Sequence, residues 1–364
     1  MRRVAWLTLA ALVIAAAPRT PDGYRMAVPS YRFEFPRDHA SHPAFRTEWW
    51  YYTGRLEGRG RRFGYELTFF RVGVNPGRRV SPSAWAPHTV LFAHIALGDE
   101  QRRRFRHHET ASRPALGMAG ADSSRYRVWI HDWSAELAAD GRTHRLRARV
   151  PELELDLELV PLKPEVVHGD SGISRKSAGL GHASHYYSLT RLETRGTLVL
   201  REGAIPVRGT SWMDHEFSSD AMSPTQVGWD WFSLQLDDGR ELMLYRLRLR
   251  DGGVEPASSG TWIERDGAAR HLAREAFDVR ATDRWTSPHS GAVYPAGWEV
   301  RVPSLGLVLT LEPTMADQEL VTGGGAGIVY WEGRVRIAGR DARGAVRGSG
   351  FVELTGYAGP PLGL

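Results

Sequence analysis

Alternation of apolar and polar residues is the feature that most constrains how this chain can fold. Between Pro151 and Val160, four leucines alternate with four acidic residues. Successive side chains of a β-strand point to opposite faces of the sheet, so this period of two predicts a strand with one buried face. Similar runs recur along the chain, and turn pairs such as Asp238-Gly239 separate several of them. The pattern predicts an all-β protein of short antiparallel strands, arranged as a sandwich or a barrel.

An internal similarity favours a duplicated barrel. Residues 207–214 are echoed by residues 346–353, and each segment follows a strand and a turn that contains glycine. We interpret the two segments as late strands of successive domains. The predicted organisation is an N-terminal domain at 28–217 and a C-terminal domain at 218–364, each long enough to bury its own core.

Residues 1–17 have the layout of a signal peptide, because two arginines precede an apolar run that ends in alanines. The run is shorter than the roughly 18 residues that a membrane-spanning helix needs. We therefore expect cleavage near residues 15–17, a periplasmic or secreted protein, and no integral membrane segment. The chain has no cysteine, so its stability must come from buried cores without disulfides.

The charge pattern argues against nucleic acid as a partner. The formal net charge is only +5, and the only lysines are Lys163 and Lys176. Arginines mostly alternate with apolar residues, as in Leu247 to Arg250, which is typical of one solvated strand face. The sequence also lacks a glycine-rich phosphate loop before a helix and a nucleophilic serine elbow, so nucleotide use and hydrolase activity are weakly supported.

Four segments concentrate aromatic and ionisable side chains, and they carry a family resemblance. They are residues 35–52, 181–187, 211–216 and 228–232. The Arg-Thr-Glu-Trp-Trp-Tyr core at 46–51, the Leu-Thr-Phe-Phe-Arg run at 67–71, the Ser-Trp-Met-Asp-His-Glu element at 211–216, and the closing elements at 330–333 and 352–357 resemble the AttH and carotenoid 1,2-hydratase family. The resemblance covers about residues 35–357.

The resemblance implies two tandem lipocalin-like antiparallel β-barrels that receive an apolar ligand, isoprenoid or lipid-like. In the hydratase branch it implies addition of water across a C=C bond, for which an acid protonates the alkene and water captures the cation, and no cofactor is expected. The alternative that the resemblance implies is a non-catalytic periplasmic carrier or accessory protein of an ABC-type export system, with a transporter permease as its partner.

Strand geometry and the family pattern together select the candidate catalytic residues. On a regular strand Trp212, Asp214 and Glu216 share one face, whereas His215 lies on the other. A carboxyl group beside an indole in a dry cavity can stay neutral and protonate an alkene, while the aromatic face stabilises the cation. We predict Asp214 as the acid with Trp212 beside it. The hydratase pattern adds His185 and Tyr187 as orienting or relay groups.

A second set of residues is predicted to contact the ligand: Glu48, Trp50, Tyr52, Trp229, Trp231, Arg246 and His215. Structural roles compete with this interpretation. The tryptophans can pack in a barrel core. Glu48 can form a buried ion pair with an arginine such as Arg46, Arg71 or Arg246, and Asp214 with His215 can tie strands together. No metal site is expected, because His182 and His185 lack an evident third ligand.

Overall fold

The computed structural model describes residues 18–29, 31–74, 88–170, 172–219, 222–323 and 327–359. The expected leader at 1–17 lies outside these residues. The described chain folds into two antiparallel sheets of 13 and 10 strands, and its helical segments are single 3-10 turns at Arg37–His39, Arg274–Ala276 and Pro303–Leu305. The all-β prediction is confirmed. None of the helices in the described residues is long and apolar enough to cross a membrane.

The first sheet uses the N-terminal half of the chain. Its strands are β1 (Thr47–Gly58), β2 (Arg61–Gly73), β3 (Thr89–Asp99), β4 (Arg104–Ser112), β5 (Ala119–Ala121), β6 (Arg127–Ile130), β7 (Trp133–Leu137), β8 (His144–Val150), β9 (Leu153–Pro161), β10 (Val166–Val167), β11 (Ser174–Arg175), β12 (Ala183–Leu200) and β13 (Gly203–Ser218). Along the sheet their order is β4-β3-β2-β1-β13-β12-β9-β8-β7-β6-β5, with β10 and β11 paired to β12. The long β12–β13 hairpin therefore closes the chain back onto β1.

The second sheet uses the C-terminal half. Its strands are β14 (Gln226–Leu236), β15 (Glu241–Leu249), β16 (Ser259–Ile263), β17 (Ala269–Ala273), β18 (Asp278–Thr286), β19 (Val293–Val302), β20 (Leu307–Pro313), β21 (Glu319–Val321), β22 (Val329–Asp341) and β23 (Gly344–Thr355). Their order is β17-β16-β15-β14-β23-β22-β20-β19-β18, and β21 pairs with β22. In both sheets the last hairpin lies beside the first strands, β13 on β1 and β23 on β14.

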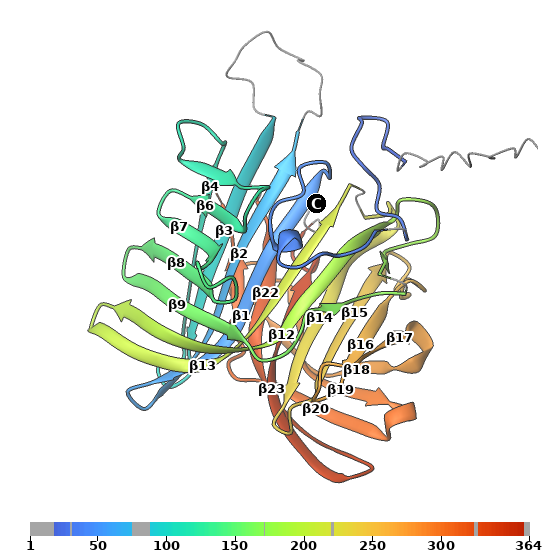
Figure 1. The fold of residues 1–364 in the computed structure, drawn as a ribbon. Coiled ribbons are helices and arrows are strands. Elements are labelled where there is room, and N and C mark those ends of the chain that lie inside the picture. The colour runs from blue at the N-terminus through green and yellow to red at the C-terminus, as the bar shows by residue number, and fades with distance from the viewer. Residues whose placement is uncertain are drawn as a thin grey trace, which may run out of the picture.

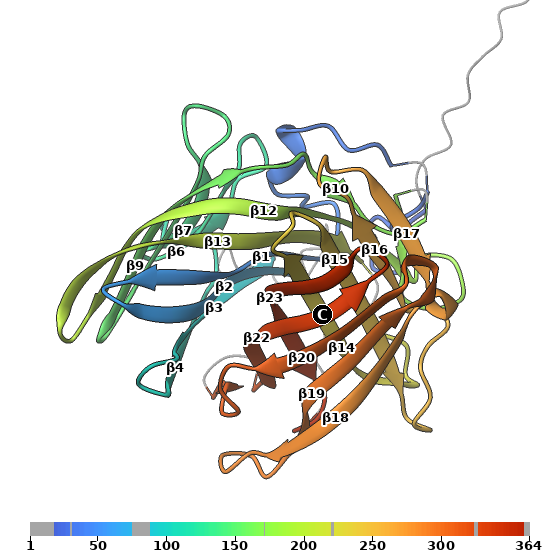
Figure 2. The same cartoon turned by 90° about the horizontal axis from the view of Figure 1, so that it is seen from below.

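The two sheets are lipocalin-like barrels that differ in closure. The N-terminal sheet curls into a nearly closed barrel, and the C-terminal sheet forms a more open half-barrel beside it (Figures 1 and 2). The strands β1 and β13 of the first sheet face β14 and β23 of the second. Where the two sheets meet, this side-by-side arrangement buries the outer face of the first sheet, so residues 211–218 of β13 are buried on both sides.

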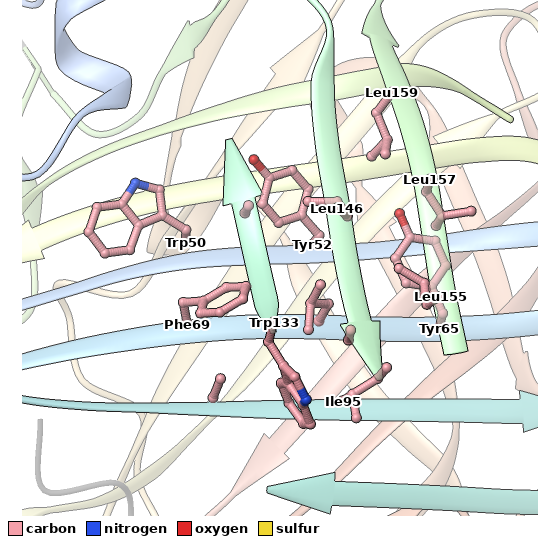
Figure 3. Close-up of a cluster of buried hydrophobic side chains, with 14 of the residues drawn as sticks. Trp50, Tyr52, Tyr65, Phe69, Ile95, Trp133, Leu146, Leu155, Leu157 and Leu159 are labelled. Carbon is pink, nitrogen blue, oxygen red and sulfur yellow. The ribbon is translucent and has the colours of Figure 1, made fainter. Parts of the chain in front are cut away.

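Each sheet has its own apolar core. The N-terminal core contains Trp50, Tyr52 and Phe69 together with the leucines of β9, and these side chains converge in the barrel interior (Figure 3). The alternating leucines at 153, 155, 157 and 159 are all buried there, as the period of two predicted. A separate core around Trp298 and Trp331 fills the C-terminal half-barrel.

A third apolar cluster joins the two sheets. It contains Tyr51, Tyr186 and Trp212 from the first sheet, and Trp231 and Tyr245 from the second. Polar contacts frame this interface. The side-chain amide of Gln235 donates to the carbonyl oxygens of Thr190 and Ser211 at 2.8 and 3.0 Å, and Lys163 and Arg191 both pair with the buried carboxylate of Glu241 at 2.6 Å. The interface is therefore a packed joint between the two halves.

Candidate functional site

A cavity of about 120 Å³ lies within the joint between the two sheets. Its wall includes residues of β1, β2, β12 and β13 on one side and of β14, β15 and β23 on the other. The aromatic residues of the wall are Trp49, Tyr51, Phe70, Tyr186, Trp229, Trp231 and Tyr245. Its ionisable residues in the described chain are Lys176, His182, Asp214, Glu216 and Glu353, together with the tyrosines.

Strand β13 supplies one wall through the expected alternation. Asp214 and Glu216 line the cavity, and Trp212 packs in the interface cluster beside them. The intervening Met213 and His215 point to the interior of the N-terminal barrel. Both sets are buried, because the barrel covers one face of β13 and the second sheet covers the other.

Asp214 is held by three neighbouring groups. The indole Nε1 of Trp212 donates to its Oδ1 at 2.6 Å, and the hydroxyl of Ser188, its cross-strand partner on β12, donates to the same oxygen. Burial raises the pKa of Asp214 to about 7, although hydrogen bonds from Ser188, Trp212 and Tyr186 oppose the rise. A carboxyl group with this pKa carries its proton for a large part of the time near neutral pH, so it can act as an acid.

Glu216 differs from Asp214 although it lies two residues further on the same strand face. The ammonium group of Lys176 lies 2.8 Å from its Oε1. The ammonium also lies 4.5 Å from the ring centroid of Tyr245 and 5.5 Å from that of Tyr186. One face of β13 therefore presents an unpaired carboxyl group at 214 and an ion-paired carboxylate at 216.

The second sheet contributes two more carboxyl groups near the cavity. Glu353 lines the wall, and the indole of Trp229 donates to its Oε2 at 2.9 Å. Its cross-strand partner Glu332 accepts a hydrogen bond from the hydroxyl of Tyr51 at 2.6 Å. Burial, with neighbouring carboxyl groups adding to it, raises the pKa of Glu353 to about 8 and that of Glu332 well above its usual value.

A further buried carboxyl group, Glu66 on β2, extends this group of acids. It accepts hydrogen bonds from Thr68 at 2.7 Å and from the hydroxyl of Tyr330 at 3.1 Å. Burial raises its pKa to about 7. Electrostatic coupling links Glu66 to Glu332 and Glu353. The joint thus holds several carboxyl groups with raised pKa values beside its ion pairs.

The structure separates His185 and Tyr187 from Asp214. Both residues lie on β12, but they face the opposite side of the sheet. The hydroxyl of Tyr187 contacts His39 Nδ1 at 2.7 Å and His215 Nδ1 at 3.1 Å inside the N-terminal barrel. His185 packs against Tyr31 with ring centroids 4.4 Å apart. The expectation that they orient or relay for Asp214 is corrected by this geometry.

The residues of β12 that reach Asp214 are the alternate ones, Tyr186 and Ser188, which the sequence interpretation missed. Ser188 is the cross-strand partner of Asp214, so knowledge of the β12–β13 register would have identified it. Lys176, Glu216 and Glu353 were also missed as cavity residues. The signal for Glu216 was present, because it shares a strand face with Asp214.

Four of the expected ligand contacts lie inside the N-terminal barrel. Trp50 and Tyr52 belong to its core (Figure 3), and their neighbours Trp49 and Tyr51 line the cavity instead. Strand alternation explains the correction, because adjacent residues point to opposite faces. Glu48 and His215, the other two, belong to a buried polar network of the same barrel, described next.

Glu48 is the centre of that polar network. Its carboxylate accepts from Arg71 Nε at 2.9 Å, from His215 Nε2 at 2.9 Å and from His42 Nδ1 at 2.8 Å. Burial alone would raise the pKa of Glu48, but Arg71 and the two histidines outweigh it and hold that pKa well below its usual value. The ion pair with an arginine that the sequence left open is formed with Arg71.

Donor atoms of His42, Glu48 and His215 lie within 4.8 Å of one another, a spacing that a metal ion could use. In this structure the same atoms satisfy each other through hydrogen bonds. His42 Nε2 also contacts Asp38 at 3.1 Å. The arrangement acts as a structural network that ties the segment before β1 to the barrel.

The remaining expected contacts divide between the cavity and the second half-barrel. Trp229 and Trp231 line the cavity. Arg246 lies away from it, because its guanidinium pairs with buried Asp230 at 2.7 Å and donates to the carbonyl oxygen of Val279 at 2.6 Å. Its position on β15 points it away from the joint, so the expected ligand contact is corrected to a structural ion pair.

The fold and the cavity define a class of protein: a pair of lipocalin-like barrels with a buried, acid-bearing, aromatic pocket between them. Comparison with known proteins specifies the family. The family model described as AttH-like matches residues 26–357. This chain belongs to the AttH-like family.

Solved structures and a curated relative agree with this assignment. An AttH structure from Nitrosomonas europaea is 34% identical, covers 92% of this chain and 99% of its own, and has a TM-score of 0.83. Kievitone hydratase from Nectria haematococca shares the fold at 14% identity, with a TM-score of 0.69 over 94% of this chain and 99% of its own. The dehydratase asqC of Emericella nidulans is 21% identical over 220 residues, which are 58% of this chain and 61% of that protein.

The chain thus spans about three fifths of the length of the curated relative it matches. The relatives include a hydratase and a dehydratase, both named for reactions that add or remove water. These names describe the reactions of the relatives themselves. For this chain, the comparisons show membership of the AttH-like family and a β-barrel fold shared with the solved structures.

Proposed function

We propose that this protein binds an apolar, unsaturated ligand of isoprenoid or lipid-like character in the cavity between its barrels, and that it adds water to a C=C bond of that ligand. The observation that carries the proposal is the buried carboxyl group of Asp214, which faces an aromatic cavity with a pKa raised to about 7. The names of the hydratase and dehydratase relatives point to the same type of reaction.

The chemistry follows from the groups in the wall. The π electrons of the alkene form a C–H bond with the proton of Asp214, and the O–H electron pair stays on the carboxylate. The aromatic rings of Trp49, Tyr51 and Trp231 stabilise the carbocation through their negative faces. Water then forms the C–O bond, and its surplus proton returns to Asp214. The net reaction consumes one water molecule and regenerates the protonated Asp214, and the reverse reaction is a dehydration.

Trp212 and Ser188 act as positioning residues in this scheme. Both donate to Oδ1 of Asp214, so they hold that oxygen and leave Oδ2 to carry the proton. Their hydrogen bonds also stabilise the carboxylate that forms when the proton leaves. The carboxyl group is therefore oriented before the ligand arrives, which is the arrangement that acid catalysis needs.

We further propose that the protein acts outside the cytoplasmic membrane, in the periplasm or after secretion. The signal-peptide layout of residues 1–17 supports this placement. Mass spectrometry of the mature protein tests it: removal of the leader near residues 15–17 is expected, and an intact N-terminus on the exported protein would contradict it.

The test of the reaction begins with the protein purified from its own host. Organic extraction and mass spectrometry identify the bound ligand, which is then incubated with protein in water labelled with oxygen-18. A product that gains one labelled hydroxyl group and one hydrogen supports the proposal. Asp214→Asn keeps the shape of the side chain, so it should retain the ligand and lose turnover by about 100-fold or more.

A surface variant gives the matched control. Asp156→Asn removes a carboxylate from an exposed position on β9, where it pairs with Arg147 at 3.3 Å, and should leave turnover unchanged. If the ligand is bound and returned unchanged by the unmodified protein, the hydratase proposal fails. That outcome would favour a carrier, such as an accessory protein of an ABC-type exporter.

A further inference from the structure

The cavity contains more acid than base. Three carboxyl groups line it, those of Asp214, Glu216 and Glu353. Among lysines and arginines, the described part of the wall contains Lys176 alone. Lys176 pairs with Glu216, at 2.8 Å. Asp214 and Glu353 therefore face the cavity without an ion-pair partner among the described residues. Asp214 is almost completely buried, and Glu353 is partly buried.

The aromatic part of the wall is suited to a positive charge. Trp49 and Tyr51 of β1 lie opposite Trp229 and Trp231 of β14, and rings of these types attract cations through their faces. The protein itself uses this property within the cavity, because the Lys176 ammonium lies over Tyr245 and Tyr186. A wall that already holds one ammonium group against aromatic faces provides direct evidence of its compatibility with cations.

We propose that the cavity is a receptor for a cationic centre on an apolar skeleton, such as a quaternary or protonated amine, and that Asp214 and Glu353 release protons to solvent when it binds. The inference rests on the site of the proposed function and goes beyond it, because a bound cation would displace the proton of Asp214 and would therefore be held by the cavity rather than hydrated. The same wall would hold a carbocation only briefly, whereas a permanent cation can remain bound.

Proton release follows from the charge balance of the empty cavity. Burial raises the pKa of Asp214 to about 7 and that of Glu353 to about 8, so near neutral pH each carboxyl group carries its proton for a large part of the time. A cation nearby favours the carboxylate form and lowers both pKa values. A neutral ligand supplies no such field and would displace no protons.

Other ionisable groups of the joint limit how many protons can leave. Among the described residues, those coupled to the two carboxyl groups or facing the cavity include Tyr51 on β1, Glu66 on β2, Lys176 after β11, His182 before β12, Tyr186 on β12, Glu216 on β13, Tyr245 on β15, and Tyr330 and Glu332 on β22. Glu332 keeps one buried oxygen without a hydrogen-bond partner. Because Glu66, Glu332 and Glu353 are mutually coupled, ionisation of one opposes ionisation of the next, and release of about one proton per cation is expected.

A pair of isosteric probes tests the inference without knowledge of the natural ligand. One probe is hexanol capped with a trimethylammonium group, and the other carries a tert-butyl group of the same shape. Isothermal titration near pH 7, in two buffers of different ionisation enthalpy, gives affinity and proton release together. We expect the ammonium probe to bind at least about tenfold more tightly and to release protons, and the neutral probe to release none.

The pH dependence and two variants sharpen the test. The affinity for the ammonium probe should rise as the pH increases from about 6 to about 9, because the carboxyl groups ionise across this range. Asp214→Asn and Glu353→Gln should each reduce the affinity for the ammonium probe and the proton release, with less effect on the neutral probe. The surface variant Asp156→Asn should change neither quantity.

Equal affinity of the two probes for the unmodified protein would overturn the inference, as would ammonium binding without proton release. This comparison does not depend on any variant remaining folded. It is also separate from the hydration assay: a protein that hydrates its ligand but does not distinguish the probes keeps the proposed function and loses the cation receptor. A protein that prefers the ammonium probe but does not hydrate its ligand keeps the cation receptor and loses the proposed function.

Discussion

The two faces of strand β13 are equally buried and have opposite electrostatics. On the barrel face, His215 joins a network in which Glu48 is matched by Arg71 and by His42, whose pKa is raised by Asp38 and Glu48 against the effect of burial. On the cavity face, Asp214 has hydrogen-bond donors but no ion-pair partner in the described part of the chain. The pKa of Glu48 is lowered well below its usual value, and that of Asp214 is raised to about 7.

The difference shows that burial alone does not decide whether a carboxyl group is ionised. Charge compensation makes the barrel face a structural network, because Arg71 and His42 stabilise the ionised form of Glu48, and Glu48 in turn favours the charged form of His42. Lack of compensation leaves the cavity face with a proton that it can donate. Substitutions at each face of β13 should therefore change stability in opposite directions.

Removal of the cation on the barrel face should be strongly destabilising. Arg71→Met leaves the Glu48 carboxylate without its guanidinium, and loss of one partner from a buried ion pair costs about 3–5 kcal/mol. Urea unfolding at neutral pH measures the change. The control is Arg147→Met at an exposed pair, for which less than about 1 kcal/mol is expected. A loss of similar size in both variants would remove the contrast.

Removal of the acid on the cavity face should be stabilising above neutral pH. Folded Asp214 holds a proton that the unfolded chain releases near its ordinary pKa of 3.8, so wild-type stability falls as the pH rises from about 4 through about 7. Asp214→Asn should therefore be more stable than wild type at pH 8, by about 1–3 kcal/mol, and nearly equal to it near pH 4. Urea unfolding at both pH values is the measurement, and a variant less stable at pH 8 would contradict it.

Substitution of His185 on β12, the strand beside β13, should have the smallest effect on the free energy of unfolding. Burial lowers the pKa of His185 to about 4, so its ring is neutral at pH 7 and packs among aromatic side chains. His185→Phe should change the free energy of unfolding by less than about 1.5 kcal/mol and leave the pKa of Asp214 unchanged. A shift in the Asp214 titration would instead restore the relay role that the family pattern implied for His185.

Sequence reasoning could predict the strands and their alternation, but it could not decide which side of the sheet holds the site. Along residues 211–218 of β13 every side chain is buried, because a barrel core lies on one side and the second sheet on the other. The period of two assigns Trp212, Asp214 and Glu216 to a common face without saying what covers that face. The choice of Trp50 and Tyr52 over Trp49 and Tyr51 was therefore open.

The local sequence pattern also could not predict which residues of other strands, or of the other sheet, lie beside Asp214. Ser188 meets Asp214 only through the register of β12 on β13, and a bulge between Leu189 and Leu192 lies within that pairing. Glu353 reaches the cavity from a strand more than a hundred residues away in the chain. Such groups come together through the packing of the two sheets, which a period of two along one strand does not encode.

Direct titration of Asp214 is the most decisive measurement. Protein labelled with carbon-13 at the aspartate carboxyl groups, compared with the Asp214→Asn variant, identifies the Asp214 resonance by its absence, and nuclear magnetic resonance follows it with pH. The account predicts a midpoint of about 7. A midpoint below about 5, as for an exposed or ion-paired aspartate, would contradict it.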